Sequence, residues 1–352
     1  MNIIPGLPKD LGLQCLVKVP YKLHKHLRAV CKSWNAVLSS PNFYKERQHH
    51  NECEEGIAYF HIGDRPTDWE VIIYYPNGRW WERLPRTTED FILDWQVCFK
   101  ECNCVYVRSK QVLVAMGLLN KYDERATVLM FNFLSRTWRR GLNMPFRLWN
   151  RGRALSPSPQ GLIYIAGCMR DGTNPHVVQF YVYNVEQNGW DFLPPINPDW
   201  VQNFCVAEFV DDMFYLLPSH ARTAHIYDPH SRLWRTINID SNGQGVDRIV
   251  SAFGNLYGFS CIESFGTDFV IVKQFDFANS SFIRVGQYPA QIYDVECAVL
   301  CGDYIFVIPM DFEDVYYQFN PSEIEEGKRW TEIEMPAEFP TENSVSATAV
   351  QI

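Results

Sequence analysis

One pattern recurs six times along the chain and constrains its fold more than any other feature. An aromatic residue is followed, after a short gap, by Trp or Phe. The pairs are Tyr74 and Trp81, Phe131 and Trp138, Tyr183 and Trp190, Tyr227 and Trp234, Phe275 and Phe282, and Phe319 and Trp330. The gap is seven positions in the first five copies and eleven in the sixth, where residues 322–328 look like an insertion. Steps of 44 to 57 residues between copies indicate a repeat architecture.

Each copy also carries the signals of a β-hairpin. In five copies Asn or Asp directly follows the first aromatic residue, which is typical of a turn between two strands. An apolar strand is expected before each pair, at Ile57–Ile62, Val112–Met116, Leu162–Ala166, Met213–Leu217, Leu256–Phe259 and Tyr304–Ile308. Further strands are expected at Phe204–Val210, Arg248–Phe253 and Glu296–Leu300. Four strands in about 50 residues predict a propeller blade, and six copies predict six blades.

The two ends of the repeat region complement each other. The first copy begins at its second strand, because no segment before Ile57 resembles the innermost strand of the other copies. Residues 344–350 alternate between small or polar and apolar side chains in the way that an inner strand does. We expect this segment to complete the first blade and so to close the ring without an open sheet edge.

This repeat resembles the kelch repeat over roughly residues 55–352. Kelch strands usually end in Gly-Gly, whereas the corresponding positions here hold Met116-Gly117, Ala166-Gly167, Leu217-Pro218, Phe259-Ser260 and Ile308-Pro309. The resemblance therefore implies an all-β, six-bladed kelch-type propeller built from degenerate blades.

The first 50 residues have helical periodicity. Leu23, Leu27, Val30, Cys31, Trp34 and Leu38 fall on one face of a single expected helix. A shorter helix is expected before Pro20, and another after Ser40-Pro41, a capping residue followed by proline at the first helical position. Three helices of this length can hardly bury a core of their own, so the apolar stripe is expected to be covered from outside.

The same segment resembles an F-box. The similarity rests on Leu7-Pro8, on Val30-Cys31 followed by Trp34, and on the spacing between these two motifs. It implies docking onto the acidic Skp-type adaptor of a ubiquitin ligase, and through that adaptor onto a cullin. The positions that would face the adaptor or lock the helices are Leu7, Pro8, Leu11, Leu16, Val30 and Trp34. The alternative is a helical cap that packs on the rest of the chain and binds no partner.

The net charge of the chain changes sign near residue 50, where the helical segment ends. Residues 1–50 hold eight Lys or Arg and two acidic residues, a net charge of +6, whereas residues 51–352 hold 24 basic and 39 acidic residues, a net charge of −15. We therefore expect two modules, a three-helix F-box domain over 1–50 and the propeller over 51–352. A strongly acidic body would be repelled by phosphate, which argues against a nucleic-acid partner.

No catalytic motif appears in the sequence, so we expect a non-enzymatic protein without cofactor or metal. The eleven Cys residues include no C-x-x-C pair, and His220, His225 and His230 fall at steps of five, which places them on different faces of a strand–turn region. No apolar run is long enough to cross a membrane, and the N-terminus lacks the features of a signal peptide. The expected location is the cytoplasm, the nucleus or both.

With no sign of catalysis, the expected function of the propeller is to bind another molecule. In kelch propellers the loops that follow the second and the outer strands form one face around the central channel. Here these loops contain aromatic residues and Arg, which are enriched at interaction hot spots. The client-binding residues expected from this pattern are Trp95, Arg147, Trp149, Arg151, Trp200, Phe204 and Tyr293. The sequence thus predicts the substrate receptor of a Skp–cullin–F-box ubiquitin ligase that binds a protein client. The alternative is a ligase-independent scaffold or a propeller that binds a small molecule.

Overall fold

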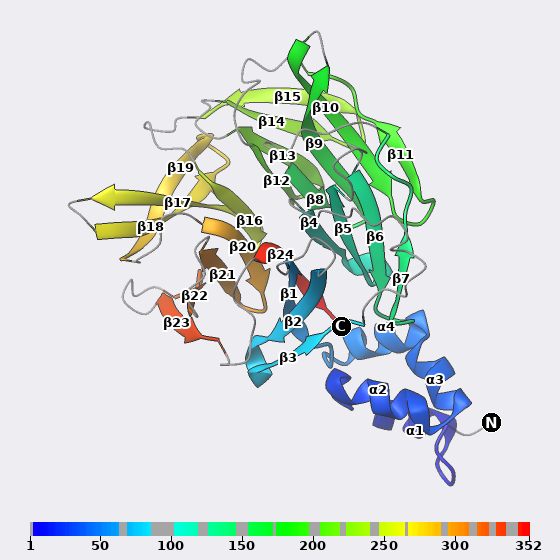
Figure 1. The fold of residues 1–352 in the computed structure, drawn as a ribbon. Helices are drawn as coiled ribbons and strands as arrows, with labels where there is room; N and C mark the ends of the chain where they lie inside the picture. Colours follow the sequence, from blue (N-terminus) through cyan, green and yellow to red (C-terminus); the bar gives the residue numbers. More distant parts are fainter. Residues whose placement is uncertain are drawn as a thin grey trace.

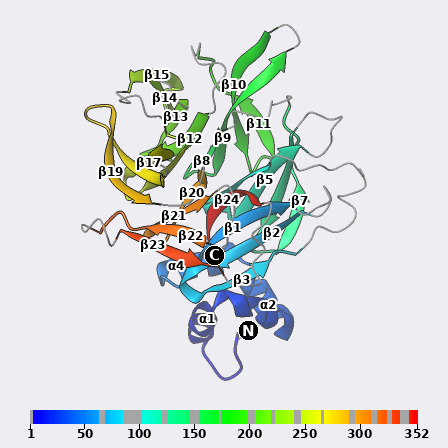
Figure 2. The same cartoon turned by 60° about the vertical axis from the view of Figure 1, so that its left-hand side comes forward.

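The computed structural model consists of a small helical head and a ring of six four-stranded antiparallel sheets (Figure 1), as the sequence predicts. The helices lie outside the ring, at one side of it, in both views (Figures 1 and 2). The structure describes residues 3–62, 69–85, 102–118, 126–145, 154–171, 174–196, 205–218, 223–239, 246–264, 267–289, 295–309, 315–323, 329–335 and 344–352.

The head, residues 3–50, contains four helices rather than the expected three. They are α1 (Lys9–Val17), α2 (Tyr21–Val30), α3 (Lys32–Leu38) and α4 (Pro41–His49). The prediction of one helix from Leu23 to Leu38 is wrong, because Cys31 has an extended backbone (φ −162°, ψ 163°) and separates α2 from α3. The Cys31 sulfur lies 3.0 Å from the Ser33 hydroxyl, a local contact of the kind that competes with helix continuation.

The start of α4 agrees with its sequence signal. Ser40 is the N-cap, and its hydroxyl oxygen accepts a hydrogen bond from the backbone N–H of Phe43 at 3.2 Å. Pro41 occupies the first turn, where its missing N–H costs no helical hydrogen bond. Phe43 then packs in the core of the head with Leu16 and Leu38.

Each blade has an inner, a second, a third and an outer strand. The inner strands are β24 (Ser344–Gln351), β4 (Cys102–Val107), β8 (Ala154–Pro157), β12 (Cys205–Val210), β16 (Arg248–Ala252) and β20 (Val295–Cys301). The second strands are β1 (Glu55–Ile62), β5 (Val112–Leu118), β9 (Leu162–Asp171), β13 (Met213–Pro218), β17 (Asn255–Ser264) and β21 (Tyr304–Pro309). We number the blades I to VI in this order.

The third and outer strands form the hairpins that carry the aromatic repeat. The third strands are β2 (Trp69–Tyr75), β6 (Ala126–Asn132), β10 (Asn174–Asn184), β14 (Thr223–Asp228), β18 (Thr267–Asp276) and β22 (Val315–Phe319). The outer strands are β3 (Trp80–Arg83), β7 (Thr137–Arg140), β11 (Gly189–Phe192), β15 (Leu233–Asn238), β19 (Ser281–Pro289) and β23 (Trp330–Glu334). In blade I a 3-10 turn, η1 (Pro76–Gly78), joins β2 to β3.

The repeated aromatic residues face each other across these hairpins. All six pairs found in the sequence are direct register partners, from Tyr74 opposite Trp81 to Phe319 opposite Trp330. Such cross-strand aromatic pairs stabilise a sheet. The Asn or Asp that follows the first aromatic residue organises the turn. In blade II, Oδ1 of Asn132 accepts hydrogen bonds from the N–H groups of the second and third residues after it, at 2.9 and 3.0 Å.

The Trp side chains also connect neighbouring blades. Three indole Nε1–H groups donate to backbone carbonyls that follow the outer strand of the preceding blade. The bonds run from Trp138 to Pro85 (2.7 Å), from Trp190 to Leu142 (2.9 Å) and from Trp234 to Pro194 (2.8 Å). A buried indole N–H needs such an acceptor. In blades II, III and IV these bonds give the Trp of the outer strand a second role, because they hold each blade to the one before it.

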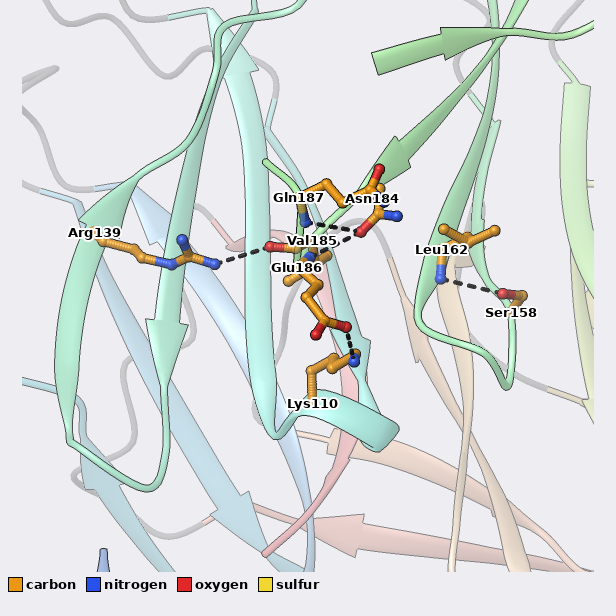
Figure 3. A network of polar contacts seen from close by, with 8 residues as sticks. All are labelled: Lys110, Arg139, Ser158, Leu162, Asn184, Val185, Glu186 and Gln187. Carbon is orange, nitrogen blue, oxygen red and sulfur yellow. Dashed lines mark hydrogen bonds and ion pairs between the residues drawn. The ribbon is translucent and has the colours of Figure 1, made fainter. Parts of the chain in front are cut away.

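Polar contacts between blades II and III add to these bonds (Figure 3). The ammonium group of Lys110 pairs with the carboxylate of Glu186, and Nη2 of Arg139 donates to the carbonyl oxygen of Val185 at 2.9 Å. Oδ1 of Asn184 in turn holds the Glu186 N–H at 3.0 Å. Because Glu186 is largely exposed, we assign little stability to the ion pair itself.

The C-terminal strand closes the ring, as expected from residues 344–350. β24 pairs antiparallel with β1 along its length and completes blade I as its inner strand. Its Ser346 hydroxyl also accepts a hydrogen bond from the backbone N–H of Cys104 in blade II, at 2.9 Å. The first and last segments of the propeller thus share one sheet, and this sheet is bonded to the next blade.

Glu208 is a partly exposed acid on the inner strand β12. Its Oε1 accepts a hydrogen bond from the Ser251 hydroxyl on β16, in the neighbouring blade, at 2.9 Å. Burial raises the pKa of Glu208 to about 7, although the hydrogen bonds from Ser251 favour the ionised form. Because the folded-state pKa lies above the unfolded value near 4.5, the free energy of unfolding should fall as the pH rises from about 4.5 to 7.

We expect Glu208→Gln to stabilise the protein at pH 8 and to leave its stability nearly unchanged at pH 4.5 to 5. Gln keeps an acceptor for Ser251 but cannot ionise. The gain at pH 8 should be about 1–3 kcal/mol, since one unit of pKa shift is about 1.4 kcal/mol and partial exposure reduces the effect. Urea unfolding of both proteins at the two pH values measures it. An equal difference at both pH values would show that Glu208 is not held neutral.

Candidate functional site

The residues expected to bind the client all lie outside the described part of the chain: Trp95, Arg147, Trp149, Arg151, Trp200, Phe204 and Tyr293. The described strand ends nevertheless show which edge of the ring borders these segments. The turn between β6 and β7 contacts the head through Leu134. Because neighbouring strands are antiparallel, β5 and β7 end at the opposite edge of blade II. The expected client loops therefore start from the edge that faces away from the head.

The residues expected to bind the adaptor fall into two groups. Leu16 and Trp34 belong to the core of the head, where Nε1 of Trp34 donates to the carbonyl oxygen of Ile3 at 2.7 Å. These two side chains lock the helices together. Pro8, Leu11 and Val30 are exposed, and Leu7 is half-buried. The exposed fraction is 48% for Leu11 and 60% for Val30, which is high for apolar side chains.

Leu23 on α2 is a further exposed apolar residue of the head, with an exposed fraction of 42%. It was part of the apolar stripe in the sequence but not of the expected adaptor contacts. Exposed basic residues accompany these side chains: Lys9, Lys22, Lys25 and Lys32. The head thus presents exposed apolar side chains amid positive charge, a combination suited to an acidic partner with an apolar groove.

Arg28 does not belong to this exposed surface, although it lies on α2 with Lys22 and Lys25. Its Nη1 donates to the carbonyl oxygen of Leu134 in blade II at 2.6 Å and to the Ser39 hydroxyl at 2.7 Å. Its Nη2 donates to the carbonyl oxygen of Leu38 at 2.9 Å. Arg28 therefore fastens α2 and the end of α3 to the propeller.

Tyr21, the first residue of α2, is the centre of the contact between head and propeller. It is 3% exposed and packs in a cluster with side chains of blades I and II. Nη1 of Arg136 donates to its hydroxyl at 2.7 Å, and the guanidinium lies over its ring, 5.6 Å from the centroid. Nη2 of Arg136 also pairs with Glu82 at 3.2 Å, so the partly buried cation has an anionic partner. Oε1 of Glu54 accepts from the Tyr21 backbone N–H at 2.6 Å.

The chain termini of the propeller meet at this contact. The backbone N–H and C=O groups of Glu54 and Ile352 bond to each other at 2.8 and 2.9 Å. Tyr44 on α4 and Tyr106 on β4 both direct their hydroxyls to the carbonyl oxygen of Gln351. The head is thus bonded to the linker, to the closing strand and to two blades. Its orientation on the propeller is fixed by buried contacts rather than by a flexible connection.

Histidine and cysteine residues do not gather into a site in the part of the chain that the structure describes. There, no group of three His, Cys, Asp or Glu side chains could hold a metal ion. His225 is buried and lies 3.0 Å from the Thr236 hydroxyl, His230 is exposed in the following turn, and His220 is outside the described residues. Burial raises the pKa of the Cys104 thiol to about 12, so this thiol stays protonated and unreactive.

Comparison with known proteins confirms the resemblance seen in the sequence. The F-box domain family matches residues 4–46. F-box/kelch-repeat protein At1g80440 of Arabidopsis thaliana is 25% identical over 334 residues, which cover 88% of this chain and 88% of that protein. F-box/kelch-repeat protein At2g44130 of the same plant is 28% identical over 272 residues, which cover 67% of this chain and 65% of that protein.

Two solved structures share the fold alone. The crystal structure of TolB from Acinetobacter baumannii has a TM-score of 0.55 at 11% identity, covering 85% of this chain and 66% of that one. A chain of the nidogen/laminin complex has a TM-score of 0.54 at 8% identity, covering 84% of this chain and 98% of that one. No helix among the described residues is long and apolar enough to cross a membrane.

Proposed function

We propose that this chain, with its N-terminal F-box domain and kelch-type propeller, is the substrate-recognition subunit of a Skp–cullin–F-box ubiquitin ligase. The observation that carries the proposal is the exposure of Leu11, Leu23 and Val30 on a basic head whose other large apolar side chains are buried or partly buried. An acidic Skp-type adaptor would cover these residues. Pro8 and Leu7 would extend the contact, and Leu16 and Trp34 would support it from the core of the head.

In this role the chain contributes proximity and orientation rather than chemistry. The propeller would hold a protein client, and the cullin bound through the adaptor would bring the ubiquitin-transfer machinery. The contacts of Tyr21 and Arg28 with blade II hold the head in one orientation, so a client on the propeller would lie at a defined place relative to the adaptor. Trp149 and Arg151 are the first client contacts to test, as neighbours in one of the expected loops. The proposed setting is the cytoplasm or nucleus, with neither nucleic acid nor membrane as a partner.

The double variant Leu11→Asp, Val30→Asp should abolish co-purification of a co-expressed Skp-type adaptor. Both side chains are exposed, so two carboxylates should leave the fold intact while they repel an acidic partner. We expect affinity to fall at least about 100-fold, because desolvated apolar anchors and charge repulsion each contribute. Leu233→Asp is the matched control, since Leu233 is an exposed leucine on the outer strand of blade IV. Adaptor recovery equal to that of the parent would contradict the proposal.

The same variant can identify the client. Removing the whole head would uncover the cluster around Tyr21, whereas the double variant keeps the propeller covered and only blocks the adaptor. In plant cells, a client that is degraded through the parent chain should accumulate on the variant. Client recovery that does not differ between the two, with and without a proteasome inhibitor, would favour a ligase-independent scaffold.

A further inference from the structure

A polar groove lies where the ring closes, between blades VI and I. Its volume is about 420 Å³, within the range of ligand-binding pockets. One wall is formed by the start of β1, the end of β2 and the η1 turn, and the other by the turn between β20 and β21 and by β23. These turns lie at the same edge of the ring as the turns that contact the head. The groove therefore lies at the edge of the ring opposite to the ends of β5 and β7.

Of the residues that the structure describes, three carboxylates and one guanidinium line this groove. Glu55, Asp303 and Glu332 contribute the negative charges and Arg79 the positive charge. Among the described residues, none of the three acids forms an ion pair within 4.0 Å, Arg79 included. They also do not form a cluster that could hold a metal ion. The groove thus has excess negative charge spread along its walls, which suits an extended cationic ligand better than a single ion.

Neutral hydrogen bonds hold two of these carboxylates in place. Nε2 of Gln351 donates to Oε1 of Glu55 at 3.1 Å, and the hydroxyl of Tyr288 donates to Oε1 of Glu332 at 2.7 Å. Burial and the neighbouring Glu332 carboxylate raise the pKa of Tyr288 to about 12, so its hydroxyl remains a donor at neutral pH. Each carboxylate is oriented without being neutralised.

The turn between β20 and β21 gives the groove its shape. Gly302 has φ +62°, which suits the first position of a two-residue hairpin turn, and an added Cβ there would lie 3.0 Å from Oε2 of Glu55. The glycine therefore lets the turn approach the carboxylate closely. Next to it, Tyr304 is 38% exposed, so an aromatic ring is accessible beside the acids. A ring beside carboxylates favours Lys and Arg side chains through cation–π attraction.

We propose that this groove docks an extended segment of a protein partner that carries Arg and Lys. The three carboxylates would pair with the basic side chains, and Tyr304 would stack on one of them. The acidic adaptor would be repelled here, so the partner is a different protein that approaches the propeller on the side of the head. This inference does not rest on the proposed ligase role, because the groove belongs to the propeller alone.

Fluorescence anisotropy of a labelled peptide, Gly-Ser-Arg-Gly-Lys-Ser-Gly, tests the proposal with the full chain. We expect saturable binding that weakens as salt rises, and at least about tenfold weaker binding to Asp303→Asn, Glu332→Gln. The control Asp211→Asn, Asp212→Asn removes the same charge from an exposed turn of blade IV at the same edge of the ring, and it should bind like the parent. Asn tolerates the left-handed backbone of both control positions.

A second variant and a second ligand keep the test decisive. Tyr304→Leu keeps apolar bulk and all charges, and we expect it to weaken binding about threefold through loss of the cation–π contact. Three results would overturn the proposal: no binding by the parent at about 1 mM peptide, equal losses in the groove and control variants, or binding of free arginine amide as tight as that of the peptide. The last result would indicate a small-cation pocket rather than a docking site.

Discussion

Removal of residues 343–352 should prevent the chain from folding into a soluble, cooperative unit. The deletion strips the inner strand from blade I, exposes the edge of β1 and removes the bonds of Gln351 with the head and of Ile352 with the linker. Burial of Val350 and Ile352 alone contributes about 3–6 kcal/mol, against a total stability of about 5–15 kcal/mol for a typical protein. We expect inclusion bodies on expression, or a broad, non-cooperative melt of any soluble fraction.

A point variant separates loss of the strand from loss of one bond. Ser346→Ala removes only the side-chain acceptor for the Cys104 N–H, and we expect a cost of about 1 kcal/mol with a cooperative melt. If the truncated chain melted as cooperatively as the parent and at the same temperature, β24 would be dispensable and the closure of the ring through blade I would be wrong.

Arg47→Met should destabilise the head by about 2–4 kcal/mol. Arg47 is 2% exposed, and its guanidinium donates to the carbonyl oxygens of Val17 (2.8 Å), Val19 (2.7 Å) and Glu52. Met keeps most of the packing of the side chain but leaves one buried and two partly buried carbonyl oxygens without their charged donor. Because these carbonyls join the end of α1 to the linker after α4, the loss should appear as a lower temperature of helix melting and as weaker adaptor binding.

Arg140→Met is the matched control for that substitution. Arg140 is exposed at the end of β7 and only approaches Asn143 at 3.3 to 3.4 Å. We expect its loss to change stability by less than about 0.5 kcal/mol. Equal effects of the two substitutions would mean that the bonds of Arg47 do not hold the head together.

The propeller could be predicted from the sequence because the residues that specify each hairpin lie close together along the chain. Each pair such as Phe131 and Trp138 is a set of direct neighbours across one hairpin, and the Asn or Asp between them directs the turn. A period of about 50 residues then repeats the same local structure six times. Even the closing strand carried its own alternating pattern, although its partner β1 is almost 300 residues away.

The head and its attachment could be predicted only in part. Its apolar spacing is compatible with one helix or two, and the break depends on the backbone of a single residue, Cys31. Arg28 looked like any surface base in the sequence, but it binds a carbonyl 106 positions away. Tyr21 and Arg136 are likewise 115 positions apart. No periodic pattern encodes such contacts, because they form only when two finished modules meet.

The groove between blades VI and I was missed for the same reason. Two of its acids come from a turn of blade VI and from β23, and closure of the ring brings the third, at the start of β1, next to them. In the sequence, none of these acids differs from an ordinary solvent-exposed side chain. The excess of acid over base in residues 51–352 was the only signal that pointed toward a cation-binding surface on the propeller.

Titration calorimetry of the purified full chain with a purified Skp-type adaptor tests the central claim most directly. We expect a one-to-one complex with a dissociation constant below about 1 μM, as for stable protein–protein interfaces. Leu11→Asp with Val30→Asp should abolish the heat of binding, whereas Leu233→Asp should leave it unchanged. A folded parent chain that shows no binding at about 50 μM adaptor would contradict the proposed role of the head and with it the ligase function of the protein.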